Sequence, residues 1–401
     1  MAAGAWAGRD AGRLPGVSPA GGQVSALQLN RATLERQLLL GRARLGVIDG
    51  VRRVAALQAQ DAVNPYVALW NRLDGFDPAD LDRAFAEQAV VKATLMRVTL
   101  HAVSAEDYRL FHAAMQPTLR AARLHDRRFR SAGLPIDEYE ALVPEVLAFA
   151  AQPRSNAEVE AWLDERLGQL PKPSVWWAMR QAGPFIHAPT GGAWSFGPRP
   201  AYLAAPQQAG GGDWEASARA LVRRYLQAFG PASIEDVAQF ALLQRTLLRP
   251  LIEAMSDELV RLPGPGGREV LDVPGAALPD EETPAPPRLL PMWDSILLAY
   301  ADRSRIIPPG YRRLAIRSNG DVLPTLLVDG QVAGVWRPVA GGIEATAFHP
   351  LAEEAWQGLA DEAAGLVRFL APREANPYAR YGRWWAGLPA AEVRTLGSDG
   401  A

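Results

Sequence analysis

The chain has 401 residues, of which 48% are hydrophobic and 21% charged, with a formal net charge of −2. This composition is that of a globular protein of about two to four domains. The absence of cysteine excludes disulfides, thiolate zinc sites and iron–sulfur clusters. Five histidines without metal-ligand spacing, and the lack of an apolar run of membrane-spanning length, predict no metal, no cofactor and a cytoplasmic location.

The chain begins with a stretch rich in Gly, Ala and Pro, "MAAGAWAGRDAGRLPGVSPAGG", which lacks a signal-peptide core. We expect residues 1–26 to form a disordered tail. In the first segment, 27–130, the pattern predicts helices and then a strand pair within "VVKATLMRVTLHAV" (90–103), after which Ser104 caps another helix. The predicted helices are 31–45, 50–57, 65–73 and 78–88.

The second segment, 131–210, repeats this order more compactly. Ser155 and Glu158 form a capping-box pattern at the start of "NAEVEAWLDERL". A helix is expected over "SVWWAMRQAG", with its adjacent tryptophans packed inward. "PFIHAPTGGAWSFG" then reads as a hairpin that turns at Thr190-Gly191-Gly192.

The third segment, 211–275, has the clearest pattern. A helix over "EASARALVRRYLQAFG" stops at Gly230-Pro231, and Ser233 with Asp236 opens the next helix as a capping box. A third helix is followed by the strands "LVRLPG" and "REVLDVP". Helix, helix, helix, strand, turn, strand is the order of a winged helix, so the three segments predict three winged helices in tandem.

The composition changes after residue 275. A proline-rich stretch is followed by alternating apolar strands with turn signals at Asn319-Gly320 and Asp329-Gly330. We expect a small antiparallel sheet or partial barrel over 276–401, a closing helix in "PLAEEAWQGLADEAAGLVRFL", and a frayed last dozen residues. The predicted fold class is α+β, with a C-shaped winged-helix array and a β-rich C-terminal domain.

Tandem winged helices suggest binding to duplex DNA, since each can offer a helix to a groove and a hairpin to the backbone. The pI of about 6.3 favours a purely structural or protein-binding array instead. The charge is uneven, however: residues 31–130 hold 16 Lys and Arg against 11 Asp and Glu, and "RAARLHDRRFR" (120–130) is the densest basic run. That run fits either a solvated helix face or a DNA contact.

Three stretches carry a resemblance to a known family. They are "LLLGRARLGVIDGVRRVAALQAQDAVNPYVALWNRL", "LMRVTLHAVSAEDY", and "LLPMWDSILLAYADRSRIIPP" with the following "LVDGQVAGVW". The chain after about residue 27 resembles the winged-helix DNA glycosylases of bacteria that excise bulky N-alkylated bases, some of which unhook interstrand crosslinks. The resemblance implies three winged helices in a C shape, and a catalytic motif at Gln58-Ala59-Gln60. A sister branch has Asp at the second position, so this chain sides with the crosslink-unhooking branch.

The chemistry of such a reaction suits two glutamines. Alkylation at N7 of guanine makes the base cationic and weakens its glycosidic bond, so the enzyme has to place a water and stabilise an oxocarbenium-like sugar. On extended backbone Gln58 and Gln60 point the same way, whereas Asp61 points to the opposite side. A solvated helix end is the alternative interpretation of this Gln pair. Lysine occurs only at 92 and 172, so we expect a monofunctional enzyme without a Schiff-base step.

The candidate DNA contacts are basic side chains around this motif: Arg53, Arg97, His101, Arg303 and Arg305. His101 is equally an internal structural residue, and Arg303 and Arg305, on one face if extended, have Asp294 and Asp302 as alternative partners. The expected partner is double-stranded DNA carrying alkylated purines, bound by a monomer associated with the nucleoid, in DNA repair or in self-resistance to a genotoxic metabolite. A non-catalytic winged-helix DNA-binding regulator is the rival interpretation.

Overall fold

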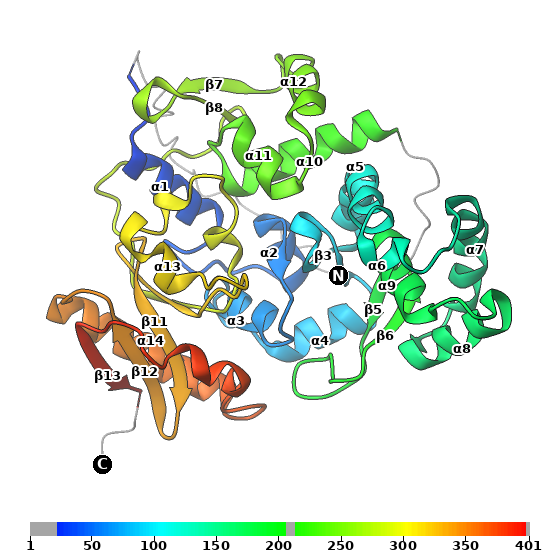
Figure 1. Ribbon diagram of the computed structural model, residues 1–401. Coiled ribbons are helices and arrows are strands. Elements are labelled where there is room, and N and C mark those ends of the chain that lie inside the picture. The colour runs from blue at the N-terminus through cyan, green and yellow to red at the C-terminus, as the bar shows by residue number, and fades with distance from the viewer. Residues whose placement is uncertain (1–21, 206–212, 398–401) are drawn as a thin grey trace, which may run out of the picture.

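The computed structural model describes residues 22–205 and 213–397 (Figure 1). Residues 1–21 of the predicted tail lie outside the described residues. The first helix begins at Ala26, which is the last residue of the predicted tail. This helix, α1 (Ala26–Arg36), starts five residues earlier than predicted, because Ser25 and Gln28 form a capping box. The structure is a mixed α and β fold, as predicted.

The first segment contains the other predicted helices, which are α2 (Val47–Val54), α3 (Asn64–Trp70) and α4 (Pro78–Ala86). Helix α2 lies three residues earlier than predicted at the same length, and α3 and α4 are each two residues shorter than predicted. The strands are β1 (Leu57–Gln58), β2 (Val90–Thr94) and β3 (Leu100–Ser104), with a 3₁₀ turn, η1 (Met96–Val98), at the hairpin tip. Ser104 caps α5 (Ala105–Leu124) through a hydrogen bond from the Asp107 amide, which confirms the predicted cap.

One antiparallel sheet runs through the first two segments in the order β1-β3-β2-β5-β6-β4. It therefore crosses the predicted border at residue 130. The hairpin prediction for the second segment is wrong in part: β5 (Phe185–Ala188) pairs with β6 (Ala201–Ala204) rather than with the residues just after Gly192. Thr190 and Gly191 instead donate backbone hydrogen bonds to the Ser195 carbonyl inside a longer loop. The outermost strand is β4 (Arg154–Ser155).

The second segment has its own apolar cluster, in which Trp176 is fully buried. The surrounding helices are α6 (Arg127–Arg130), α7 (Ile136–Phe149), α8 (Asn156–Leu167) and α9 (Lys172–Ala182). Ser155 and Glu158 form the predicted capping box of α8. These helices lie at one end of the molecule, beside the strands β5 and β6 (Figure 1).

The third segment has the predicted element order. It runs α10 (Trp214–Phe229), α11 (Ile234–Ala241), α12 (Arg245–Glu253), β7 (Val260–Pro263) and β8 (Glu269–Asp272). Ser233 and Asp236 form the predicted capping box of α11. The strands β7 and β8 form a two-stranded sheet, which Ala232 extends by a single bridge to Leu271, and they lie at the top of the molecule in Figure 1.

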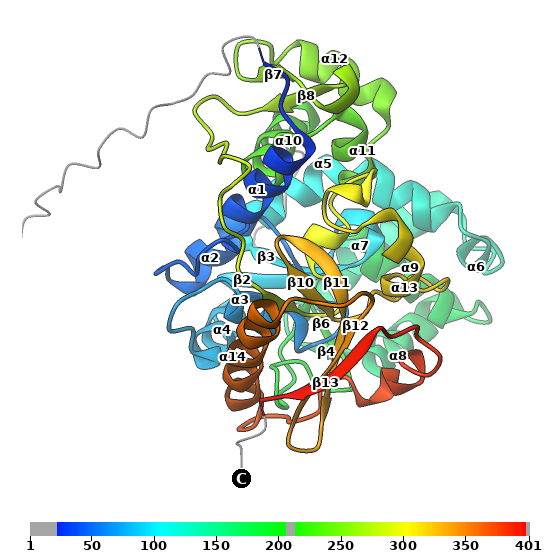
Figure 2. The ribbon, with the colours of Figure 1, turned by 90° about the vertical axis from the view of Figure 1, so that its left-hand side faces the viewer.

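The C-terminal part is an antiparallel sheet of order β13-β12-β11-β10-β9, with α14 (Glu353–Leu370) alongside (Figure 2). Its strands are β9 (Arg288–Leu290), β10 (Thr325–Val328), β11 (Gln331–Val339), β12 (Gly342–Ala347) and β13 (Glu392–Leu396). Asp329-Gly330 forms the predicted turn, whereas the Asn319-Gly320 turn is flanked only by a single bridge, Ile316 to Val322. The expectation of a frayed end is wrong over 392–396, which pair with β12.

The five-part division and the count and C-shaped arrangement of the winged helices stay predictions. Long-range ion pairs connect the parts. Arg72 in the first segment binds Asp294 through two hydrogen bonds of 2.8 Å, and both side chains are buried. Arg36 binds Asp272 of β8 at 2.7 and 2.8 Å. The first segment therefore contacts both the third segment and the C-terminal part.

Candidate functional site

The strand β1 places Gln58 inside the protein. Gln58 lies opposite His101 of β3, so the two side chains share one face of the sheet. The Gln58 residue is only 4% exposed, and its Oε1 accepts a hydrogen bond of 2.8 Å from Arg97 Nη2. Buried carboxamides need such partners, so Gln58 is held in a defined orientation.

Arg97 reaches Gln58 from the tip of the β2–β3 hairpin. Its φ of 55° and that of Val98, 56°, lie in the left-handed region that tight hairpin turns use. The same Nη2 lies 3.3 Å from His101 Nε2, while His101 Nδ1 lies 3.1 Å from the Thr99 carbonyl. Because a carbonyl accepts only, Nδ1 carries the proton and Nε2 accepts from Arg97.

Burial sets the charges in this cluster. It lowers the pKa of His101 to about 3, with a further contribution from the Arg97 charge. It also lowers the pKa of Arg97 to about 10, assisted by the nearby charge of Arg303. At neutral pH His101 is therefore neutral and Arg97 is cationic.

Gln60 lies in a different setting. The chain leaves the sheet after the Ala59 amide donates to the Leu100 carbonyl at 2.8 Å, and Gln60 is exposed. It lines a cavity of about 220 Å³ at the hairpin tip. The other lining residues come from β2, the hairpin tip, α9, β5 and β6: Thr94, Val98, Thr99, Leu100, Arg180, Gln181, His187 and Tyr202.

No pattern in the sequence pointed to most of this cavity, because its walls are brought together by the pairing of β2 with β5. Arg180 donates to the Asn156 side chain at 2.6 Å and to the Tyr202 hydroxyl at 2.7 Å. Burial and the charges of Lys92 and Arg180 hold the pKa of His187 well below its usual value. The wall facing Gln60 is thus a fixed polar surface with a neutral imidazole.

The acidic and basic residues considered for the chemistry, Asp61 and the two lysines, have partners outside the cavity beside Gln60. Asp61 forms an ion pair of 2.7 Å with Arg380, so its carboxylate is engaged by the C-terminal part. Lys92 is buried with its Nζ 4.5 Å from the centre of the Phe196 ring, and burial lowers its pKa to about 8. Lys172 forms an ion pair with Asp164. Neither lysine lines the cavity beside Gln60.

Arg303 and Arg305 lie in a 3₁₀ turn, η4 (Arg303–Arg305), and not on the extended backbone considered above. Arg305 donates to the Pro231 carbonyl at 2.9 Å and stacks on Tyr300 at 4.1 Å. The alternative partners are wrong: Asp294 binds Arg72, and Asp302 accepts from the Ser304 amide at 3.0 Å. Arg303 is half-buried, and its Nε has no hydrogen-bond partner in the described chain.

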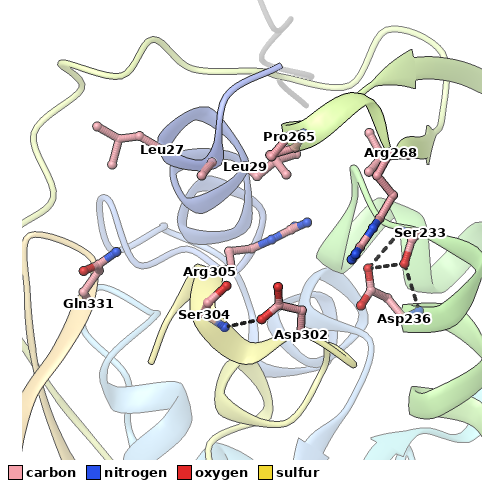
Figure 3. Close-up of a pocket in the computed structure, with 12 residues that line it drawn as sticks. Leu27, Leu29, Ser233, Asp236, Pro265, Arg268, Asp302, Ser304, Arg305 and Gln331 are labelled. Carbon is pink, nitrogen blue, oxygen red and sulfur yellow. Dashed lines mark hydrogen bonds between the residues drawn. The ribbon is translucent and has the colours of Figure 1, made fainter. Parts of the chain in front are cut away.

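A second cavity, of about 350 Å³, lies between α1, α11, η4 and the β7–β8 turn (Figure 3). Arg305 and Arg268 reach into it, and Asp236 and Asp302 offset their charge. Asp236 is occupied by Ser233, through hydrogen bonds of 2.8 and 2.9 Å. The charges of these four side chains therefore cancel. Neither Gln58 nor Gln60 lines this cavity.

The remaining candidate, Arg53, is exposed in the last turn of α2. Among the described residues, no group of His, Asp and Glu is placed to hold a metal ion. None of the helices in the described ranges is long and apolar enough to cross a membrane.

Comparisons with known proteins agree on one family. The model of the AlkZ-like DNA glycosylases matches residues 51–369. The interstrand DNA cross-link repair glycosylase of Streptomyces sahachiroi is 25% identical over 362 residues, which cover 84% of this chain and 94% of that protein. The solved structure of the S. sahachiroi DNA glycosylase AlkZ superimposes with a TM-score of 0.74 at 22% identity, covering 88% of this chain and 98% of that one, which shows a shared fold.

Proposed function

The chain belongs to the AlkZ-like family of DNA glycosylases, and on this premise we propose that it hydrolyses the N-glycosidic bond of bulky N-alkylated purines. N7-alkylguanine is the proposed lesion, including guanines joined in an interstrand crosslink. The name of the S. sahachiroi relative supports crosslink repair. The carrying observation is the segment Gln58-Ala59-Gln60, in which one glutamine is held by a half-buried arginine and the other opens onto a cavity.

The two glutamines have different proposed roles. Arginine has donors only, so Gln58 must turn Oε1 toward Arg97 and its Nε2 away. Gln58 then acts as a hydrogen-bond donor, and the adjacent positive charge strengthens that donor by polarising the amide. Gln60 keeps both its oxygen and its nitrogen free of described partners and accepts from the attacking water.

A neutral pair suits a cationic leaving group. The alkylated base departs as a neutral molecule, so no strong acid is needed and the main task is to position water at C1′. Two carboxamides achieve this without the desolvation cost of a buried carboxylate. Asp61, the nearest carboxylate in sequence, is neutralised by Arg380.

The DNA contacts divide into direct and indirect ones. Arg53 and Arg303 are the proposed direct phosphate contacts, because Arg53 is exposed and Arg303 is partly exposed. Arg305 reaches its cavity with part of its guanidinium already bound to carbonyls. His101 is fully buried and Arg97 has a buried Nη1, so both act from behind Gln58 unless the hairpin moves.

The product is an abasic site with an intact backbone. A glycosylase that also cuts the strand usually attacks the sugar with an amine. Lys92 is buried against Phe196 and Lys172 is paired with Asp164, so neither amine is offered at the cavity beside Gln60. This supports a monofunctional enzyme.

The deciding experiment is excision of N7-methylguanine and of an N7-linked interstrand crosslink from duplex DNA. Wild type is compared with Gln58→Ala, Gln60→Ala and the double variant, whose melting temperatures verify folding. Base release that is lost on substitution supports the proposal. Release that survives in the double variant overturns the assigned residues, and DNA binding without release of either lesion supports the regulator interpretation.

A further inference from the structure

A cluster of arginines at the end of the first segment lies beside Trp177 of the second segment, where α6 packs against α9. The cluster, here called the Trp177 surface, consists of Trp177 in α9, Arg123 at the end of α5, and Arg127, Arg128 and Arg130 in α6. Arg127, Arg128 and Arg130 are exposed, and Arg123 and Trp177 are half-buried. None of these arginines forms an ion pair with a residue in the described ranges, whereas the neighbouring Arg120 is paired with Glu140.

Two guanidinium groups are already ordered by the indole. Arg123 lies with its Cζ 4.7 Å from the centre of the Trp177 ring, and Arg128 lies at 4.9 Å. A guanidinium that stacks on an aromatic ring keeps its edge N–H groups free for a phosphate and loses less rotamer entropy on binding. The Nε of Arg123 is buried without a hydrogen-bond partner in the described chain.

Negative charge on this surface is scarce. Asp126 is the only acidic residue between Arg123 and Arg130, and its Oδ1 accepts a hydrogen bond of 2.7 Å from the Arg128 amide as the cap of α6. The surface therefore offers four arginines with little internal neutralisation. An extended anion is the partner that such a surface fits.

The helix α9 connects this surface to the cavity beside Gln60. Gln181 lines that cavity, and Trp177 precedes it by four residues, so both lie on one face of α9 about 6 Å apart along its axis. One DNA strand carries a phosphate about every 3.4 Å of helix axis. A strand that passes the cavity thus comes within a few nucleotides of the Trp177 surface.

We propose that the Trp177 surface binds the phosphate backbone of the DNA on one side of the lesion, through Arg123, Arg127 and Arg128. This inference rests on the proposed function, because that function places the lesion at Gln60. It makes the contact between α6 and α9, where the first segment ends against the second, an anchor that holds flanking duplex while the Gln58-Ala59-Gln60 segment acts on the base. A contact of this kind adds affinity without base specificity.

The test measures binding, so it does not depend on excision. The affinity of a duplex with a central abasic-site analogue is measured by fluorescence anisotropy at several salt concentrations. The double variant Arg127→Gln/Arg128→Gln is compared with Arg44→Gln/Arg368→Gln, which removes the same charge from exposed positions elsewhere. Loss of two phosphate contacts lowers the slope of log K against log salt by about 1.8 in the first variant only.

Duplexes shortened on either side of the lesion locate the contact. The Arg127/Arg128 variant should differ from wild type when one particular flank is long, and match it when that flank is removed. Equal salt slopes in the two double variants overturn the proposal, as does an effect that no flank changes. If excision fails but the salt slope changes as expected, the surface stands and the proposed lesion chemistry falls.

Discussion

Arg97 Nη2 lies 2.8 Å from Gln58 Oε1 and 3.3 Å from His101 Nε2. One guanidinium group in the hairpin turn thereby fixes two side chains, which lie on the separate strands β1 and β3. The arginine cannot accept a hydrogen bond, so it dictates that the Oε1 end of the Gln58 carboxamide faces Arg97 and the Nε2 end faces away. The asymmetry between the two glutamines is a consequence of this contact rather than of their spacing.

The first prediction concerns the dependence of Gln58 on Arg97. We expect Gln58→Leu to lower kcat for excision by about 100-fold, which is the typical effect of removing one positioned donor. Arg97→Met should lower kcat about as much, because Gln58 then loses its orientation. The double variant should be no worse than either single variant. Single-turnover excision rates at saturating DNA measure all three.

Arg97→Lys is the matched control for this cycle. Lysine keeps the charge and a donor but lacks the planar fork, so it should recover part of the rate. Additive losses in the double variant would show that Arg97 acts independently of Gln58. A loss that appears only in KM would instead make Arg97 a simple DNA contact.

The second prediction is the pH dependence of the reaction. His101 has a pKa of about 3 and Arg97 one of about 10, so neither changes charge between pH 5.5 and 8. We expect the kcat for excision of an N-alkylated purine whose own charge is constant over this range to vary less than about twofold. A bell-shaped profile with a limb near pH 6.5 would contradict the assigned roles and make a histidine the acid or base.

The third prediction concerns the effect of the lowered pKa of His101 on the stability of the fold. The folded state binds the His101 proton less readily than the unfolded state, so protonation favours unfolding as the pH falls below about 6.5. His101 alone should cost about 2 kcal/mol of unfolding free energy between pH 7 and pH 5. His101→Asn should flatten the pH dependence in urea titrations by that amount. A His101→Asn variant whose stability falls with acid as steeply as that of wild type would contradict a buried, neutral His101.

The sequence predicted the parts of the fold that local chemistry decides. Ser233 with Asp236 and Ser155 with Glu158 form the expected capping boxes, and Asp329-Gly330 forms the expected turn. Long-range pairings were missed, because no local pattern distinguishes the true partner of a strand. The continuation of β5 into β6 across a twelve-residue loop is such a case.

The residues of the candidate site were predicted in part, whereas the walls of the cavity beside Gln60 were not. The sequence pointed to Gln58, Gln60, Arg97 and His101, and the structure brings Gln58, Arg97 and His101 into contact while Gln60 faces a separate cavity. The walls contributed by Arg180, His187 and Tyr202 depend on the pairing of β2 with β5, which is set by tertiary packing.

The fourth prediction concerns the buried ion pair between Arg72 and Asp294. Asp294 binds Arg72 rather than Arg303 or Arg305, and both partners are 1% exposed. Removal of one partner leaves an unpaired buried charge, so Asp294→Ala should lower the unfolding free energy by about 3–5 kcal/mol. The double variant Arg72→Met/Asp294→Leu should recover much of this loss. Denaturant unfolding monitored by tryptophan fluorescence measures both, and an additive loss would contradict pairing.

The last prediction concerns β13, where the composition suggested a frayed end. Leu396 is 8% exposed and lies opposite Ile343 of β12, whereas Val393 on the same strand is 54% exposed. Leu396→Ala should therefore destabilise the protein by about 2–4 kcal/mol, while Val393→Ala should stay within about 0.5 kcal/mol. Thermal unfolding compares the two variants with wild type. Equal effects of the two substitutions would mean that β13 does not hold its place on the sheet, since only a fixed register distinguishes an inward leucine from an outward valine.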